Sequence, residues 1–210
     1  SANPETQMKA VEEIRTAALN ANDPDQAFKK TCSSNGTVPA LTKALGDTNN
    51  VRVIEKVCGA ILNFTRIDEG KAACIKAGSE KVITAVLETT QDERVREQAC
   101  AAIANIATSA EGKAACVRAG SEKMLTAVLE TTEDEMVREY ACRAISNIAT
   151  SAEGQAACVR AGSEKVITAV LETTQDEMVR EKACKAICSI ACSAEGKAAC
   201  VRAGSEKMLT

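Results

Sequence analysis

The sequence predicts an all-α protein, an α-solenoid built from stacked three-helix repeats. A block of 42 residues recurs almost unchanged, and its full copies occupy residues 69–110, 111–152 and 153–194. A glycine returns at the same place in every copy, and the apolar residues follow helical rather than alternating spacing. A repeat of this length indicates one supersecondary unit stacked on itself, not one globular core around one active site.

The repeats are expected to form a single domain over residues 1–210. An earlier, more diverged copy is in register at 27–68, and partial repeats occupy 1–26 and 195–210. Asn3 followed by Pro4 indicates the start of a helix that reaches about Asn20. Asp23-Pro24 repeats this signal for the next helix.

The copy that begins at Glu111 illustrates the first two helices of a repeat. Ser109 is expected to cap a short first helix that reaches about Ala119. Gly120 then supplies the left-handed residue that ends this helix. Ser121 is expected to cap a second helix, whose apolar face consists of Met124, Leu125, Val128 and Leu129.

A capping box is expected to open the third helix. Thr132 with Glu135 forms this pattern, and it places carboxylates in the first turn, where the helix dipole favours them. Thr90 with Glu93 and Thr174 with Glu177 repeat the box in the neighbouring copies. The helix is expected to reach about Ala149, and the positions spaced for burial are Val137, Ala141, Ala144, Ile145 and Ile148.

Composition argues against several classes of function. The net charge is −3 with both signs interspersed, and the chain has no Trp, one Tyr and two Phe, so nucleic-acid binding is not expected. No apolar run approaches the length of about 18 residues that a membrane span needs. The chain lacks His, and its carboxylate pairs recur in every copy as helix caps. We therefore expect no enzyme activity and no cofactor.

Nine of the eleven cysteines lie in two repeat columns within apolar helical stripes: Cys32, Cys74, Cys116, Cys158 and Cys200, and Cys58, Cys100, Cys142 and Cys184. They are expected to pack as small apolar groups and to stay reduced, which indicates a cytoplasmic or nuclear location. Cys188 and Cys192 stand outside both columns. No metal site is expected, because the chain has neither a Cys-x-x-Cys pair nor a His.

The repeat unit resembles the armadillo repeat over essentially all of the chain. The motifs behind this resemblance are Gly36-Thr-Val-Pro-Ala-Leu41 and the third-helix endings around Asn105 and Asn147. The related HEAT repeat is an alternative, which the fixed glycine and the Asn near the third-helix end disfavour. The resemblance implies a right-handed solenoid whose third helices line a groove for an extended peptide.

In the armadillo family the Asn of each repeat bonds the peptide backbone, and the matching positions here are Asn63, Asn105 and Asn147. An amide suits this role because it both donates and accepts hydrogen bonds. The alternative is that each Asn bonds locally near its helix end. Nuclear-import members carry a Trp four residues before the Asn, but here those positions hold Gly59, Ala101, Arg143 and Lys185. Recognition of a basic signal is therefore not implied.

The copies differ most along one stripe of the third helix, which is expected to be solvated and to line the groove. Its columns are Gln98, Tyr140 and Lys182; Ala101, Arg143 and Lys185; Asn105, Asn147 and Ser189; and Thr108, Thr150 and Cys192. Drift of unconstrained surface residues is the alternative explanation. However, the columns of Glu122, Lys123 and Glu130, also expected to be exposed, are identical in the full copies. Specific binding is therefore favoured.

The predicted peptide-binding residues are Asn63, Gln98, Asn105, Tyr140, Arg143, Asn147, Lys182, Lys185 and Ser189. The cations of this set, with Lys56 and Arg66, favour an acidic or phosphorylated peptide. A column of carboxylates flanks the stripe and tempers its charge: Glu55, Glu97, Glu139 and Glu181. A partner protein or extended peptide is thus expected.

Two alternatives to peptide binding remain open. Head-to-tail contact between the partial repeats at the two ends would let the chain self-assemble into a structural array. The near-identity of the copies is also consistent with an engineered repeat protein that has no natural ligand.

Overall fold

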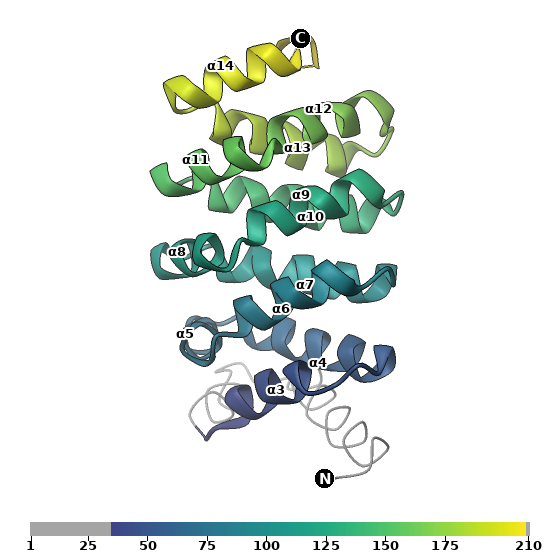
Figure 1. Ribbon diagram of the computed structural model, residues 1–210, viewed down its shortest axis with the longest axis vertical. Helices are drawn as coiled ribbons and strands as arrows, with labels where there is room; N and C mark the ends of the chain where they lie inside the picture. Colours follow the sequence, from purple (N-terminus) through teal and green to yellow (C-terminus); the bar gives the residue numbers. More distant parts are fainter. Residues whose placement is uncertain (1–34, 209–210) are drawn as a thin grey trace. The chain divides into compact units, whose positions relative to one another are not determined.

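The computed structural model describes residues 35–208, which form twelve α-helices and one short 3-10 helix, with no strand in that range (Figure 1). The all-α prediction is thereby confirmed. The helices expected after Asn3 and Asp23 lie outside the described residues. None of the described helices combines the length and the apolarity that a membrane span requires. The chain divides into two compact units, Ser1–Ile106 and Ala107–Thr210.

The described part of the first unit contains five helices: α3 (Thr37–Gly46), α4 (Val51–Phe64), α5 (Asp68–Ala77), α6 (Ser79–Thr89) and α7 (Glu93–Ile106). The third helices α4 and α7 of successive repeats pack side by side, and the second helices α3 and α6 do the same (Figure 1). Within this unit the second and third helices therefore pack on helices of their own kind.

The second unit repeats this arrangement with seven helices and a final 3-10 turn: α8 (Ala110–Ala119), α9 (Ser121–Thr131), α10 (Glu135–Ile148), α11 (Ala152–Ala161), α12 (Ser163–Thr173), α13 (Glu177–Ile190), α14 (Ala194–Ala203) and η1 (Ser205–Met208). The third helices α10 and α13 pack together, as do the second helices α9 and α12 (Figure 1). The first helices α8, α11 and α14 form a third row.

In the repeats whose first helix is described, a left-handed glycine ends that helix, as predicted. Gly120 and Gly162 have φ values of 71° and 70°. The amides of Lys123 and Met124 donate to the Gly120 carbonyl, so the glycine itself is the N-cap of α9. The expectation that Ser121 caps this helix is wrong, because Ser121 is already the first helical residue.

The serine at this position is buried, and in three copies it joins neighbouring repeats, beginning with Ser79, whose hydroxyl oxygen lies 2.6 Å from that of Thr42. The hydroxyl oxygens of Thr126 and Ser163 lie 2.6 Å apart, and those of Thr168 and Ser205 are separated by the same distance. Each threonine hydroxyl also donates to a backbone carbonyl one turn earlier in its own helix. These buried hydroxyl pairs therefore satisfy each other's hydrogen-bonding needs between stacked second helices.

Aspartate, rather than threonine, caps the third helices α7, α10 and α13. The Asp134 carboxylate accepts from the amides of Met136 and Val137 at 2.9 and 3.1 Å. The Thr132 hydroxyl instead accepts from the Asp134 amide at 3.2 Å. Asp92 and Asp176 cap α7 and α13 in the same way. The predicted capping boxes of Thr132, Thr90 and Thr174 are therefore wrong, since the third helices begin only after these aspartates.

The core consists of the predicted apolar stripes. All five predicted core positions of α10 are fully buried. The column cysteines in the described range are buried too, except Cys184, which is half-buried. Burial raises the pKa of the Cys58 and Cys142 thiols to about 12, so both stay protonated at neutral pH. They therefore pack as small apolar groups.

Candidate functional site

The third helices bring the predicted site residues together within each unit. In the first unit Asn63 lies on α4, and Gln98 and Asn105 lie on α7. In the second unit α10 carries Tyr140, Arg143 and Asn147, and α13 carries Lys182, Lys185 and Ser189. Because α4 packs beside α7 and α10 beside α13, each group shares one face of its unit.

This face is less solvated than the sequence pattern predicted. Asn63 and Ala101 are buried, with only 5% and 2% of their surface exposed. Seven of the predicted stripe residues are half-buried: Gln98, Asn105, Tyr140, Arg143, Asn147, Lys182 and Ser189. Thr108, Thr150, Lys185 and Cys192 are exposed as expected. The stripe is only partly solvated because it borders the seam between two packed third helices.

The Asn column makes hydrogen bonds between repeats. Nδ2 of Asn105 donates to the hydroxyl of Thr65, the residue that follows α4, at 3.1 Å. In the same column, the Ser189 hydroxyl lies 3.3 Å from that of Ser146 on α10. These two side chains therefore connect adjacent repeats. The sequence gives no signal for this, because the partners are about 40 residues away.

Tyr140 and Arg143 form a stacked pair on α10. The Arg143 guanidinium carbon lies 5.0 Å from the centroid of the Tyr140 ring. The two residues are one helical turn apart, which is the spacing at which side chains meet on a helix surface. Attraction between the cation and the ring holds the guanidinium in place. A stacked guanidinium can still offer the N–H groups along its edge to a carboxylate or phosphate.

Glu181 engages both lysines of the α13 stripe. Its Oε1 lies 3.0 Å from Nζ of Lys182 and 2.6 Å from Nζ of Lys185. The hydrogen bonds from Lys185 and Lys182 hold the pKa of the Glu181 carboxyl below its usual range. The Lys182 side chain is 16% exposed and that of Lys185 is 63% exposed. Lys182 is thus anchored by packing, whereas Lys185 extends into solvent.

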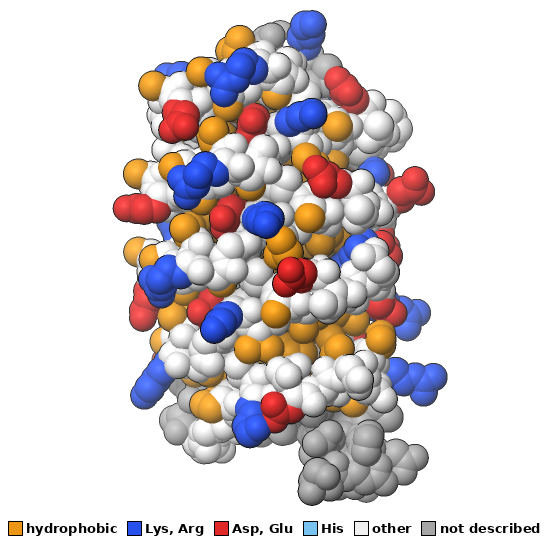
Figure 2. All heavy atoms as spheres, viewed as in Figure 1, with side chains coloured by type: hydrophobic (Ala, Val, Ile, Leu, Met, Phe, Trp, Pro, Cys, Tyr) orange, Lys and Arg blue, Asp and Glu red, His pale blue; other side chains and the backbone are white. Residues whose placement is uncertain are grey.

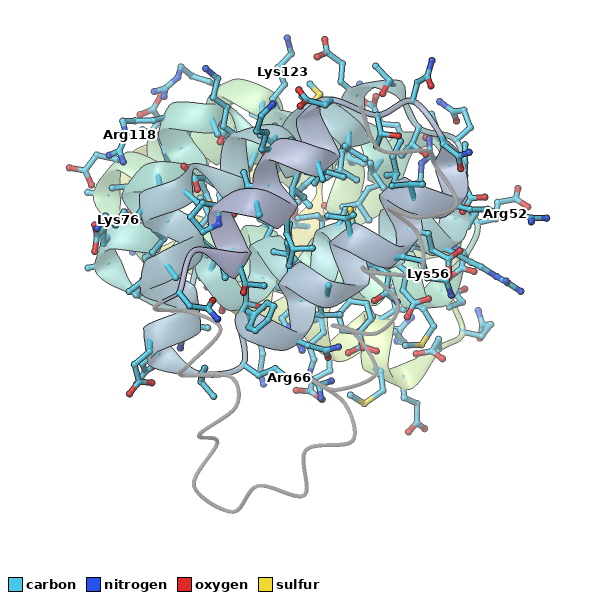
Figure 3. All side chains as sticks on the ribbon, turned by 90° about the horizontal axis from the view of Figure 1, so that it is seen from below. Arg52, Lys56, Arg66, Lys76, Arg118 and Lys123 are labelled. Carbon is cyan, nitrogen blue, oxygen red and sulfur yellow. The ribbon has the colours of Figure 1, made fainter. Side chains whose placement is uncertain are left out.

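The first unit also presents basic side chains near its third helix α4. Lys56 and Arg66 extend outward from α4 and from the turn after it, on a different side from Lys76 at the end of α5 (Figure 3). Nζ of Lys56 lies 3.9 Å from the Glu55 carboxylate. The flanking carboxylates therefore offset part of the charge in both units, as the sequence suggested.

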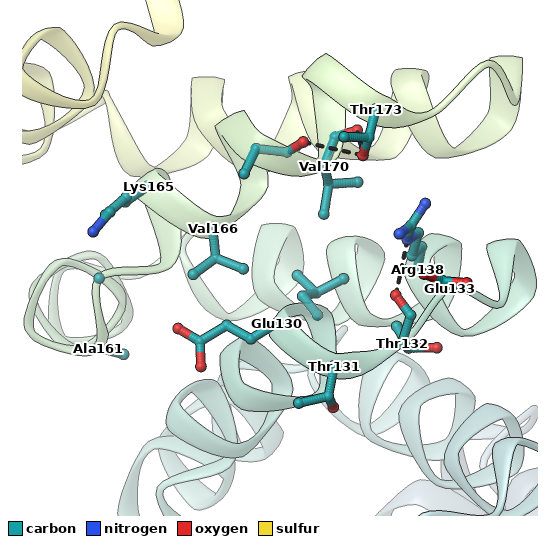
Figure 4. A pocket seen from close by; sticks show the side chains of 13 residues that line it. Glu130, Thr131, Thr132, Glu133, Arg138, Ala161, Lys165, Val166, Val170 and Thr173 are labelled. Atoms are coloured by element: carbon teal, nitrogen blue, oxygen red, sulfur yellow. Dashed lines mark hydrogen bonds between the residues drawn. The ribbon is translucent and has the colours of Figure 1, made fainter.

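Three cavities in the second unit lie on its first and second helices. The cavity between α9 and α12 has a volume of about 610 Å³, with Glu130, Lys165 and Arg138 around it and Val166 and Val170 on its wall (Figure 4). Cavities of about 560 and 240 Å³ lie between α8 and α11 and beside α14. None of the three is lined by a predicted peptide-binding residue. On this face, basic side chains recur from repeat to repeat with apolar side chains between them (Figure 2).

Glu122 is a buried carboxylate that sequence reasoning placed at the surface. Only 8% of its surface is exposed, and its Oε2 has no hydrogen-bond partner, as is also true of Glu164. Burial raises the pKa of the Glu122 carboxyl, and the positive charge of Arg160 partly opposes this. Lys123 and Glu130 are exposed as expected. The invariance of the Glu122 column is thus explained by packing and no longer argues against drift.

Within the described residues, no cluster of three His, Cys, Asp or Glu side chains is arranged to hold a metal ion. Cys188 and Cys192 are exposed, and the Cys192 thiol donates to the Cys188 carbonyl at 3.3 Å. The third-helix face offers hydrogen-bonding and charged groups that are suited to recognition.

Comparison with known proteins finds similarity to helical repeat proteins of the HEAT and armadillo types. A family model described as a HEAT-like repeat matches residues 85–148. An engineered protein is 31% identical, with a TM-score of 0.88, over 100% of this chain and 83% of its own. A designed armadillo repeat protein in complex with the peptide (KR)4 is 27% identical, with a TM-score of 0.85, over 99% of this chain and 86% of its own.

Computationally designed armadillo repeat proteins for modular peptide recognition are 26% identical, with a TM-score of 0.86, over 99% of this chain and 85% of their own. No curated protein matches the chain. The similar solved structures named here are thus engineered or designed proteins.

Proposed function

We propose that this chain, which belongs to the armadillo repeat class of α-solenoid proteins, is a non-enzymatic scaffold that binds an extended peptide along its third helices. The observation that best supports this proposal is the group of side chains shared by α10 and α13. The stacked pair of Tyr140 and Arg143 lies one turn before Asn147 on α10, which packs beside the lysines of α13.

Asn147 is the residue best suited to bind the peptide backbone. It is half-buried and lies on the same helix as the Tyr140–Arg143 pair. Its amide can donate and accept several hydrogen bonds at once, as a peptide main chain requires. Asn105 occupies the same column on α7, and its amide also bonds Thr65 in the preceding repeat. Buried Asn63 and the Ser189 hydroxyl, which lies close to Ser146, contribute less.

We propose that the preferred peptide is acidic or phosphorylated. On the α10 and α13 stripe, the three cations Arg143, Lys182 and Lys185 outnumber the two carboxylates of Glu139 and Glu181. The stacked guanidinium has a geometry that suits carboxylate and phosphate oxygens. A designed relative is in complex with the basic peptide (KR)4. A preference for basic peptides is therefore the main alternative to test.

The proposal is tested by fluorescence anisotropy with acidic, phosphorylated and basic peptides of equal length, at low and physiological salt. The acidic and phosphorylated peptides are expected to bind more tightly and to weaken with salt, since exposed charges are screened. Arg143→Ala should weaken their binding about tenfold. Arg118→Ala is the matched control, because Arg118 is an exposed arginine on the first helix α8. Tighter binding of the basic peptide would refute the charge preference, and no binding of any peptide would refute the scaffold.

Self-association is a second candidate function, and one observation favours it. Val201 on α14 is 64% exposed, whereas its counterparts Val117 and Val159 are half-buried. We propose that a second copy of the chain covers this apolar side chain. Light scattering over a concentration series should then show growth for the wild type and less for Val201→Lys. A wild-type monomer at every concentration rules the association out.

Two further proposals concern the origin and the location of the protein. The near-identical copies and the engineered neighbours support an engineered array. A peptide-library screen that returns no binder would favour an array without a ligand.

The buried thiol columns support a reducing compartment, cytoplasmic or nuclear, where such thiols persist. Imaging of the tagged chain in cells tests this location.

A further inference from the structure

The two third helices of the second unit hold their cations in different ways. On α10, Arg143 stacks on the ring of Tyr140. On α13 the same two columns hold Lys185 and Lys182, and both ammonium groups bind one oxygen of Glu181. Repeat positions that are otherwise equivalent therefore differ: an aromatic ring stacks against the cation on α10, and one carboxylate binds both cations on α13.

The Glu181 carboxylate occupies the place at which an acidic ligand would bind these lysines. Its side chain is 45% exposed, so solvent and ligands can reach it. The pKa of Glu181 lies below its usual range because of the two lysines, and the carboxylate is therefore charged at neutral pH. An exposed ion pair of this kind is weak, so an incoming anion can replace it.

We propose that Glu181 is an internal competitor that makes the α13 lysine pair select a phosphorylated side chain over a carboxylate. This inference rests on the proposed peptide-binding function. When an aspartate or glutamate of the peptide binds, the lysines exchange the Glu181 carboxylate for another carboxylate, so little binding free energy is gained. A phosphoryl group has a charge of about −1.5 to −2 and three acceptor oxygens, so the same exchange favours it. Lys185 is the more exposed lysine and moves to the ligand, while Lys182 stays in place.

The test compares Glu181→Gln with Glu139→Gln, which removes the same charge from the equivalent position on α10. Within the described residues, Glu139 makes no ion pair. Dissociation constants are measured for two peptides that differ only in a phosphoserine or a glutamate. Glu181→Gln is expected to tighten binding of the glutamate peptide about two- to fivefold and to reduce the preference for phosphoserine. Glu139→Gln should change both constants less and leave their ratio as in the wild type.

Equal effects of the two variants would overturn the inference, because they would show only a general change in net charge. An unchanged phosphoserine preference in Glu181→Gln would overturn it as well. Both side chains are on the surface, so both variants are expected to fold, which circular dichroism checks.

A second measurement separates this inference from the proposed function. An NMR titration of the Glu181 carboxyl in the free protein and in the phosphopeptide complex should show the pKa of Glu181 rising in the complex, as Lys185 turns from this carboxylate to the phosphate. If peptides bind, but the Glu181 pKa stays the same in the complex and Glu181→Gln keeps the wild-type preference for phosphoserine, the inference fails and the scaffold function stands. If no peptide binds the wild type, both fail together.

Discussion

At the scale of single residues, Gly154 occupies a position in the first turn of α11 that has no room for a side chain. A Cβ atom there would lie 2.6 Å from the carbonyl carbon of Ile148 and would overlap its oxygen. Gly196 has the same relation to Ile190. Gly162 differs, because its φ is +70° and nothing lies within 4 Å of the Cβ position. One glycine is thus required by close approach and the other by backbone conformation.

Replacing these two glycines is expected to have different costs. Gly154→Ala should destabilise the protein by about 3 kcal/mol, because the overlap is with main chain that cannot rotate away. Gly162→Ala should cost about 1 kcal/mol, the strain of a left-handed alanine. Urea unfolding followed by circular dichroism measures both. Equal losses for the two variants would contradict this assignment of their roles.

Sequence reasoning predicted one of these glycines and not the other. The left-handed glycines follow from their place at the end of an apolar helical pattern. The requirement for glycine at position 154 depends on how closely α11 approaches the end of α10, and the periodicity within one helix does not show this distance. Glu122 was misplaced for a similar reason. A charged residue at the start of an amphipathic helix is normally solvated, and only the packed repeats bury it.

At the scale of elements, the start of the third helix depends on Asp134. Its carboxylate satisfies two amides that have no partner inside the helix. Asp134→Ala should therefore cost about 1 kcal/mol in the free energy of urea unfolding. Asp134→Asn should retain most of this stability, since an asparagine side chain also caps helices. Glu133→Ala, in the same loop, should stay within about 0.5 kcal/mol of the wild type. A loss for Glu133→Ala as large as that for Asp134→Ala would refute this assignment of the cap.

The sequence predicted the helices well and their caps less well. The observed bounds of α8, α9 and α10 agree with the predicted spans to within a few residues. The cap of α10 was misassigned because Thr132, Asp134 and Glu135 all fit capping patterns. Thr132 is still the C-cap of α9, where its amide donates to the Val128 carbonyl, whereas Asp134 directly precedes Glu135, the first residue of α10. Where one helix ends thus decides where the next begins.

The sequence predicted which helices carry the candidate site, but it did not predict how buried those side chains are or which residues they contact. Comparing the copies located a stripe on the third helices, and the structure gathers those residues on α4 and α7 and on α10 and α13. The hydrogen bonds of Asn105 and Ser189 could not be predicted, because they depend on the distance between neighbouring third helices. The Tyr140–Arg143 and Glu181–Lys185 pairs have helical spacing and could have been found from sequence.

At the scale of the whole molecule, the cysteines report on how firmly the repeats are packed. The buried thiols are distributed over both units: Cys58, Cys74, Cys100, Cys116, Cys142, Cys158 and Cys200. Burial raises the pKa of Cys58, Cys74, Cys142 and Cys158 to about 12. Cys188 and Cys192 are exposed. Since the thiolate is the reactive form, burial and a raised pKa both protect the core thiols.

Brief alkylation of the native protein at pH 7.5 is therefore expected to label Cys188 and Cys192 and to leave Cys58 and Cys142 unmodified. Mass spectrometry of peptides identifies the labelled sites, and a Cys188→Ala/Cys192→Ala variant provides the control for labelling elsewhere. In rising urea, the buried thiols should become reactive together with the loss of the helical signal, because each repeat is stable only while its neighbours cover it. Rapid labelling of Cys142 without urea would show that α10 opens in the native state, and the packed third-helix seam would then be an unsuitable platform for a peptide.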